Sequence, residues 1–128
     1  YVADKKIYVI DNGLRNAVSF SISEDKGRQL ENLVFLELKR RGHDIYFFKD
    51  GRECDFVIRE RNKVVMAIQV TDILNEHNEA REVEGLRAAL KKFNLKNGMI
   101  LTKSQEGTIR RSGHNIKLVP VWKWTLDI

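Results

Sequence analysis

Two apolar runs separated by a short polar link constrain the fold of this chain most strongly. The first covers residues 53–59, within E-C-D-F-V-I-R-E, and the second covers residues 64–71, V-V-M-A-I-Q-V-T. The second is rich in the β-branched residues that favour strands, and the first carries the strand-favouring triplet F-V-I. Polar links of a few residues, such as residues 60–63 between these runs, join neighbouring antiparallel strands. The pattern therefore predicts an antiparallel pair of strands in the middle of the chain.

The flanking periodicities predict a mixed α/β fold around this pair. A strand at 45–48 would complete an antiparallel three-strand meander, and residues 79–93 have the spacing of a helix. A helix at 27–41 is indicated by apolar residues at helical spacing, by Asp25 as its cap and by Gly42 as its stop. The other expected elements are strands at 6–10, 99–102 and 115–119, an irregular connection at 14–22, a polar loop at 103–113 and a closing segment from Pro120. A meander, a crossover helix and a parallel strand together predict a mixed β-sheet flanked by helices.

The length and composition limit the domain organisation and the cellular setting. A chain of 128 residues suits one compact core. We expect residues 1–22 to form an N-terminal strand and connection, and residues 23–128 to form the main domain. The single cysteine, Cys54, excludes an internal disulfide, and one thiol fits the reducing cytoplasm. No apolar run approaches the roughly 20 residues that span a bilayer, so no membrane partner is expected.

The charge favours an acidic partner. The net charge is +5 and the sequence pI is about 9.4, and surplus Lys and Arg commonly neutralise phosphates. Acids such as Glu76 and Glu82 dilute this field. DNA is therefore the favoured partner on charge, although a basic surface that serves only solubility is the plain alternative.

Strand alternation places several polar residues together. Because side chains alternate between the faces of a sheet, Asp55 and Gln69 should lie side by side on adjacent strands, with Thr71 one pleat further on. The same alternation puts Cys54 on the face of Phe56 and Ile58, and Val64 on the face of Met66 and Ile68. Glu31, at the edge of the first helix's apolar stripe, should lean over the face that carries Gln69.

Converging oxygen ligands of this kind are what Mg²⁺ prefers. Glu31, Asp55 and Gln69 are therefore the candidate metal ligands, and Thr71 completes the candidate catalytic set. Each of these residues taken alone has an ordinary structural explanation. Gln69 is the exception, because an amide inside an apolar strand must find hydrogen-bond partners.

Longer motifs connect these residues to a known group. The carrying stretches are K-I-Y-V-I-D-N-G-L-R-N-A, G-R-Q-L-E-N-L-V-F-L-E-L-K-R-R-G, E-C-D-F-V, I-Q-V-T and P-V-W-K-W-T-L. In this order the sequence resembles the C-terminal domain of archaeal AAA-type ATPases, which is similar to the PD-(D/E)xK nuclease superfamily. The resemblance implies a restriction-endonuclease-like fold and an ATPase domain upstream of Tyr1 in the same polypeptide.

The resemblance also assigns roles. The family's helix acid falls on Glu31, its strand aspartate on Asp55, and its E-x-K motif on Gln69-Val70-Thr71. Gln69 supplies an oxygen without a charge, and Thr71 removes the lysine's ammonium group. Another cation could replace it, and Arg81 or Arg87 on the second helix are the places to look.

Two classes of function follow from these residues. The first is a nuclease-like module with a degenerate metal site that cleaves little or no nucleic acid, and that binds nucleic acid or docks partners for the ATPase. The alternative is an active Mg²⁺-dependent DNA endonuclease that uses Glu31, Asp55 and Gln69. The chain lacks the G-x-x-x-x-G-K-[ST] loop, so no ATP site of that kind is expected in it. Self-association is left open.

Overall fold

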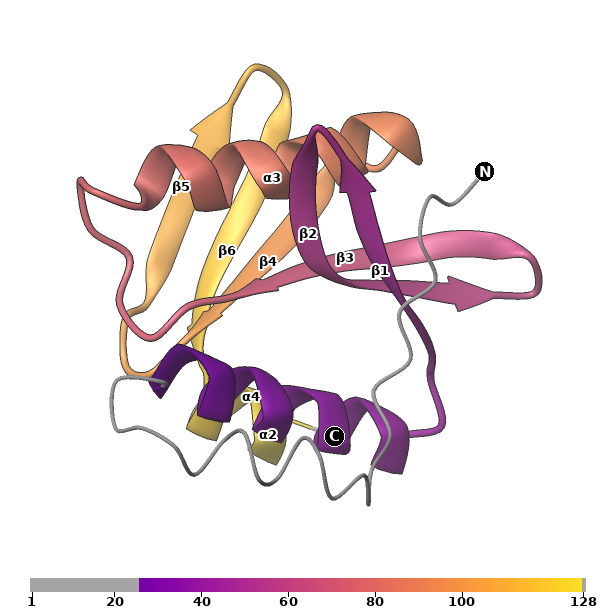
Figure 1. Ribbon diagram of the computed structural model, residues 1–128, viewed down its shortest axis with the longest axis horizontal. Helices are drawn as coiled ribbons and strands as arrows, with labels where there is room; N and C mark the ends of the chain where they lie inside the picture. The colour runs from indigo at the N-terminus through magenta and orange to yellow at the C-terminus, as the bar shows by residue number, and fades with distance from the viewer. Residues whose placement is uncertain (1–25, 128) are drawn as a thin grey trace.

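The computed structural model describes residues 26–127, which form a six-stranded mixed sheet with helices on both faces (Figure 1). The elements are α2 Lys26–Arg40, β1 Asp44–Asp50, β2 Arg52–Glu60, β3 Lys63–Val70, α3 Glu79–Lys92, β4 Asn97–Thr102, β5 Gly107–Arg111, β6 His114–Pro120 and α4 Val121–Leu126. The predictions for residues 6–10, for residues 14–22 and for Asp25 lie outside the described residues. The same is true of the proposed N-terminal unit at 1–22.

The strand order confirms the predicted mixed sheet. It runs β1-β2-β3-β4-β6-β5. β1, β2 and β3 pair as an antiparallel meander, and α3 then crosses over to place β4 parallel to β3. β6 is parallel to β4, and β5 is antiparallel to β6.

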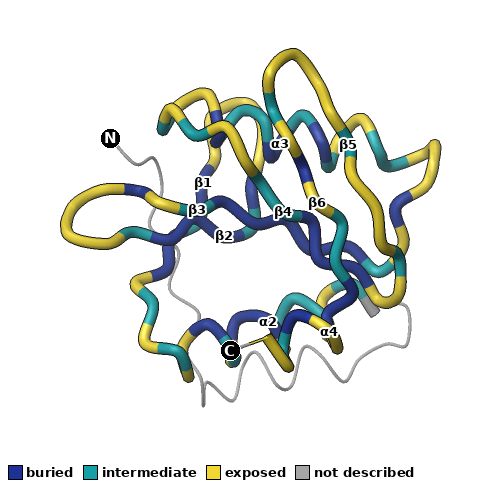
Figure 2. The backbone as a smooth tube through the Cα atoms, turned by 180° about the vertical axis from the view of Figure 1, so that it is seen from behind, coloured by how far each residue is buried: buried dark blue, intermediate teal, exposed yellow. Residues whose placement is uncertain are grey.

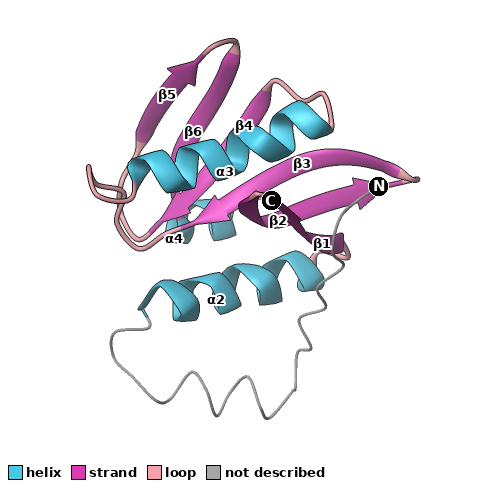
Figure 3. Cartoon of the chain, turned by 45° about the horizontal axis from the view of Figure 1, so that its top comes forward, coloured by secondary structure: helices cyan, strands magenta, loops and turns pink. Residues whose placement is uncertain are grey.

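Each face of the sheet has its own hydrophobic core. On one face, α2 and α4 pack through Val34, Leu38 and Trp124 onto residues of β2 and β3 that include Phe56 and Ile68. On the other face, α3 packs onto a second core; its members include Cys54, Val57, Ala67, Leu86, Ile100 and Ile116. Figure 3 shows α3 and α2 on opposite sides of the strands. The prediction of a helix on each face is confirmed.

The predicted end of the first helix is confirmed in detail. Gly42 has a positive φ of 83°, a conformation that residues with a Cβ rarely adopt. It lets the His43 N–H donate to the Leu38 carbonyl and the Gly42 N–H donate to the Lys39 carbonyl. These bonds satisfy carbonyls at the end of α2 that would otherwise lack partners.

The predicted loop at 103–113 is wrong in part, because it contains β5. The sequence G-T-I-R-R is short and largely polar, and only Ile109 of this strand is half-buried. That composition suits an edge strand, which meets solvent along one side. The closing segment after Pro120 forms the short helix α4.

Two irregularities correct the predicted alternation of side chains. Tyr46 pairs with Val57 and Phe48 with Cys54, so two residues of β2 lie opposite Phe47. This bulge moves Cys54 to the α3 face, away from Phe56. A second shift places Val64, paired with Arg59, in the α3 core as well.

None of the helices within residues 26–127 is long and apolar enough to cross a membrane.

Candidate functional site

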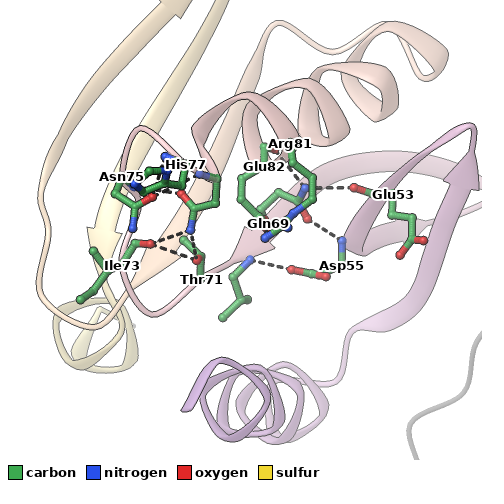
Figure 4. Close-up of polar contacts among 11 residues, drawn as sticks. Glu53, Asp55, Gln69, Thr71, Ile73, Asn75, His77, Arg81 and Glu82 are labelled. Carbon is green, nitrogen blue, oxygen red and sulfur yellow. Dashed lines mark hydrogen bonds and ion pairs between the residues drawn. The ribbon is translucent and has the colours of Figure 1, made fainter. Parts of the chain in front are cut away.

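A cleft of about 340 Å³ lies at the open end of β2 and β3, beside the first turn of α3. Its lining consists of a turn, two strands and a helix: Gly51, Arg52, Glu53, Asp55, Gln69, Arg81 and Glu82. Figure 4 shows Asp55 and Gln69 next to each other, with Arg81 and Glu82 above them. The predicted adjacency of Asp55 and Gln69 on neighbouring strands is thus confirmed.

Asp55 takes up the bulge of β2 and bonds to β3 at two points. Its N–H donates to Gln69 Oε1 at 2.8 Å, and its Oδ2 accepts from the Val70 N–H at 2.8 Å. The carboxylate therefore accepts a bond from a β3 backbone N–H next to the bulge. The residue is half-buried, so this hydrogen bond contributes to the stability of the fold.

Gln69 is an almost fully enclosed amide, with 2% of its surface exposed. Its Nε2 donates to the Glu53 carbonyl and to the Glu82 carbonyl, both at 3.0 Å, while Oε1 accepts from Asp55. Both N–H groups of the amide are used, and its partners fix which end is oxygen. The side chain joins β2 to α3 through backbone groups alone.

Gly85 allows α3 to come this close. A Cβ at this position would lie 2.1 Å from the Glu53 carbonyl oxygen and 2.8 Å from Gln69 Nε2. Because the first of these is a backbone atom, a side chain could be accommodated only if β2 or α3 moved. Gly85 and Gln69 therefore belong to one contact between β2, β3 and α3. We call it the amide lock, and it consists of Gln69, Gly85 and the carbonyls of Glu53 and Glu82.

Thr71 lies just beyond β3 and is also buried, with 9% exposed. Its hydroxyl donates to the Ile73 carbonyl at 3.4 Å and accepts from Asn78 Nδ2 at 3.5 Å. Asn78 in turn donates to the Ile73 carbonyl at 2.8 Å. Thr71 thus secures the loop that leads into α3, and no charged group stands at its position.

Glu31 belongs to the helix on the opposite side of the sheet from α3, and its predicted part in the candidate site stays a prediction. It is a half-buried residue of α2, and α2 packs on the face opposite α3. The apolar stripe of α2 meets Phe56, Ile68 and Val70, whereas Gln69 projects toward the Glu82 carbonyl. The Glu31 charge still reaches Glu82, because it contributes to raising the pKa of that carboxyl.

Glu82 is the residue of this cleft that sequence reasoning missed. Its side chain is only 13% exposed, and burial raises its pKa, against the lowering effect of Arg81 and with a smaller raising effect of Glu31. Such perturbed acids gather at functional clefts. The sequence held a weak signal, since Glu82 precedes Val83, an inner-face residue of the predicted helix.

The two candidate replacements for the missing lysine differ in position. Arg81 lines the cleft and pairs with Glu82 at 3.2 Å. Arg87 instead pairs with Glu84 at 2.9 Å and donates to Nδ1 of His114, the first residue of β6. Only Arg81 is therefore placed beside Asp55 and Gln69.

Two of the oxygens assigned to a cation accept hydrogen bonds from backbone N–H groups in this arrangement. One Asp55 oxygen accepts from Val70, and the Gln69 oxygen accepts from Asp55. Across residues 26–127, no three His, Cys, Asp or Glu side chains gather closely enough to hold a metal ion. The described donor set does not fit a resident Mg²⁺ for two reasons. The Gln69 amide already bonds to backbone groups, and no three acids lie together among these residues.

Cys54, beside the site residue Asp55, is fully buried. Its thiol donates to the carbonyls of Ile68 and Phe56 at 3.5 and 3.6 Å. Burial raises its pKa far above the usual range of a thiol, and the Asp55 charge adds to this effect. Since the thiolate is the nucleophilic form, Cys54 is a packing residue in the folded domain.

Comparison with known proteins places the chain in a family. Residues 26–124 match the model of a domain of unknown function, DUF4143. An uncharacterized protein of Methanocaldococcus jannaschii is 43% identical over 98% of this chain, and an uncharacterized protein of Haemophilus influenzae is 30% identical over 69%. The matched regions amount to 30% and 22% of those two proteins, so the chain spans less than a third of the length of either relative. The match over nearly all of the described residues means that the chain belongs to the DUF4143 family.

Proposed function

We propose that this chain is a nuclease-like domain that has lost phosphodiester cleavage and associates with nucleic acid as part of a longer protein. The observation that carries the proposal is the hydrogen bonding of Gln69. In a nuclease of the resembled group, an acid at this position would help to hold a cation. Here the side chain is an amide whose two N–H groups are both donated to backbone carbonyls.

The electrostatics support the same conclusion. An amide adds no negative charge to attract a divalent ion, and Thr71 supplies no ammonium group near an attacked phosphate. Removal of one well-placed electrostatic group typically costs on the order of 100- to 1000-fold in rate. Arg52 and Arg81 both line the cleft, and the Arg81 guanidinium pairs with Glu82.

The rest of the proposal concerns the setting of the domain. The net charge of +5 supports association with nucleic acid. The greater length of both relatives supports a role beside other domains, and the resemblance to AAA-type ATPases makes an upstream ATPase domain the proposed partner. A buried, unpaired cysteine suits a cytoplasmic protein.

A cleavage assay on the complete 128-residue chain tests the loss of chemistry. Supercoiled plasmid would be incubated with the native chain, with Asp55→Asn and with Thr71→Lys, each with Mg²⁺ or Mn²⁺. Asp55→Asn is a better control than a change to alanine, because its amide oxygen can still accept a hydrogen bond from the Val70 N–H. We expect no cleavage by the native chain above that of Asp55→Asn.

The other outcomes separate the alternatives. Robust native cleavage that disappears in Asp55→Asn would overturn the proposal in favour of the Mg²⁺-dependent endonuclease. Cleavage that appears only in Thr71→Lys would support it, by tracing the loss to the missing ammonium group.

A further inference from the structure

A second hollow lies on the sheet face opposite α3, away from the cleft. This sheet groove has a volume of about 560 Å³, and its lining includes Val65, Met66, Met99, Arg110, Asn115 and Lys117 from four strands. Figure 2 shows these strands from behind; α2 and α4 lie at the lower edge of the view. Among the described elements, the groove is lined by strand residues alone.

The alternation of β5 and β6 explains why polar residues face this groove. Ile109 and Ile116 point into the α3 core, so their neighbours Arg110, Asn115 and Lys117 point the other way. Arg110 pairs with Asn115, and Thr108 pairs with Lys117. Arg110 and Lys117 are therefore diagonal neighbours, about 7 to 8 Å apart between Cα atoms.

The charged residues that line the groove are both cations, Arg110 and Lys117. Both Arg110 and Lys117 are exposed, and no acid of the described residues lines the groove. Neither side chain forms an ion pair or a side-chain hydrogen bond within residues 26–127, whereas the adjacent Arg111 pairs with Glu79 at 2.6 Å. Two neighbouring exposed cations without an acidic partner leave a positive surface that attracts an anion.

We infer that the sheet groove binds the phosphate backbone of duplex DNA. This inference rests on the proposed association with nucleic acid and names the surface that carries it. Guanidinium, ammonium and amide groups are the usual donors to phosphate and sugar oxygens, and Arg110, Lys117 and Asn115 supply one of each. Single strands are commonly bound by stacking bases on aromatic rings. No aromatic residue within 26–127 lines this groove, so duplex DNA is the better fit.

The test compares two double variants of the complete chain that lose the same charge. Arg110→Gln with Lys117→Gln removes both groove cations. Lys39→Gln with Lys92→Gln is the matched control, on the exposed ends of α2 and α3. Binding of a labelled 20-base-pair duplex would be measured by fluorescence anisotropy at several salt concentrations.

We expect the groove variant to bind about tenfold more weakly at low salt, with the slope of log affinity against log salt reduced by about 2. The control should lose clearly less. Circular dichroism and the thermal midpoint would show that both variants fold, which is expected because all four residues are exposed.

Three results would overturn the inference, and they have different meanings. Equal losses in the two double variants, from a native chain that binds, would reject the groove alone. Competition by polyglutamate as strong as by duplex DNA would make an acidic protein the occupant instead. No binding by the native chain at low salt would reject both the groove and the proposed association with nucleic acid, and would leave the cleavage result to stand by itself.

Discussion

The cleft and the sheet groove contain polar groups of similar kinds, but they direct them differently. In the cleft, the Gln69 amide, the Asp55 carboxylate and the Arg81–Glu82 pair bond to the protein itself. In the groove, Arg110 and Lys117 have no acidic partner among the described residues. The first region resembles a functional site in composition but is organised as part of the fold. The second is ordinary in sequence but leaves its charges available to a ligand.

This contrast shows that the partners of a polar residue say more about its role than its type does. Every buried side-chain nitrogen and oxygen among the described residues has a hydrogen-bond partner. Polar groups at the cleft should therefore matter mainly for stability, and those at the groove mainly for binding.

Gly85→Ala should destabilise the domain most, by about 3 kcal/mol or more in the free energy of unfolding. The added methyl group would lie 2.1 Å from the Glu53 carbonyl oxygen, and such overpacking forces the backbone to shift. Chemical denaturation of the complete chain would measure the loss.

Gly27→Ala provides the matched control, because no atom of the described residues lies within 4 Å of a Cβ at that position in α2. Alanine favours a helix over glycine by up to about 1 kcal/mol, so this variant should be unchanged or more stable. A Gly85→Ala protein as stable as the native one would show that the amide lock is loose.

Gln69→Glu should cost about 2 to 4 kcal/mol at pH 7, because a carboxylate would face the Glu53 and Glu82 carbonyls in place of a donor. Burial should raise the pKa of the new carboxyl. The loss should therefore be largest at neutral pH and shrink as the pH falls and the carboxyl takes up a proton.

Gln29→Glu adds the same charge at an exposed position of α2 and should change stability by less than about 0.5 kcal/mol. Thermal denaturation between pH 4 and pH 8 would compare the two variants. If Gln69→Glu were tolerated at pH 7, the amide would be replaceable and the acid of the nuclease motif could be restored.

Asp55→Ala should cost about 1 to 2 kcal/mol, since the Val70 N–H would lose its acceptor. Asp55→Asn should retain most of the stability, because an amide oxygen can take the same bond. Equal losses in the two variants, measured by denaturant titration, would mean that the negative charge is what this position requires.

Glu82→Gln should have the smallest effect and the opposite sign. Because burial raises the Glu82 pKa, the folded state favours the protonated carboxyl more than the unfolded state does. Its stabilising contribution is present at low pH and is lost as the pH rises through the folded-state pKa. The variant should therefore gain in thermal midpoint relative to the native chain at pH 7 but not at pH 4, and a gain at pH 4 alone would contradict the assigned pKa direction.

Much of the fold could be predicted from the sequence because its elements are strongly periodic. The helix ending at Gly42, the meander through β1–β3 and the crossover helix α3 all have clear apolar spacing and short links. β5 could not be predicted in this way, because an edge strand needs little apolar surface and Ile109 alone marks its inner face. Its partner strand β6, not its own sequence, defines it.

The candidate site was predictable in part. The adjacency of Asp55 and Gln69 follows from strand pairing, and the need of a buried amide for partners was evident from the apolar run around it. The identity of those partners was not, because the Glu53 and Glu82 carbonyls are backbone groups that any residue would supply. The bulge at Asp55 and the face occupied by Glu31 depend on how whole elements pack.

The burial of Cys54 makes its thiol a reporter of how often this part of the domain opens. It is the single cysteine of the 128-residue sequence, and its side chain is enclosed between β2 and α3. A thiol reagent can react with it only after those two elements separate, so the labelling rate reports how often this part of the molecule opens. Because Cys54 is next to Glu53 of the amide lock, its modification would report the separation of β2 from α3. Opening events too brief or too rare to alter the spectrum of the domain would still accumulate as modified thiol.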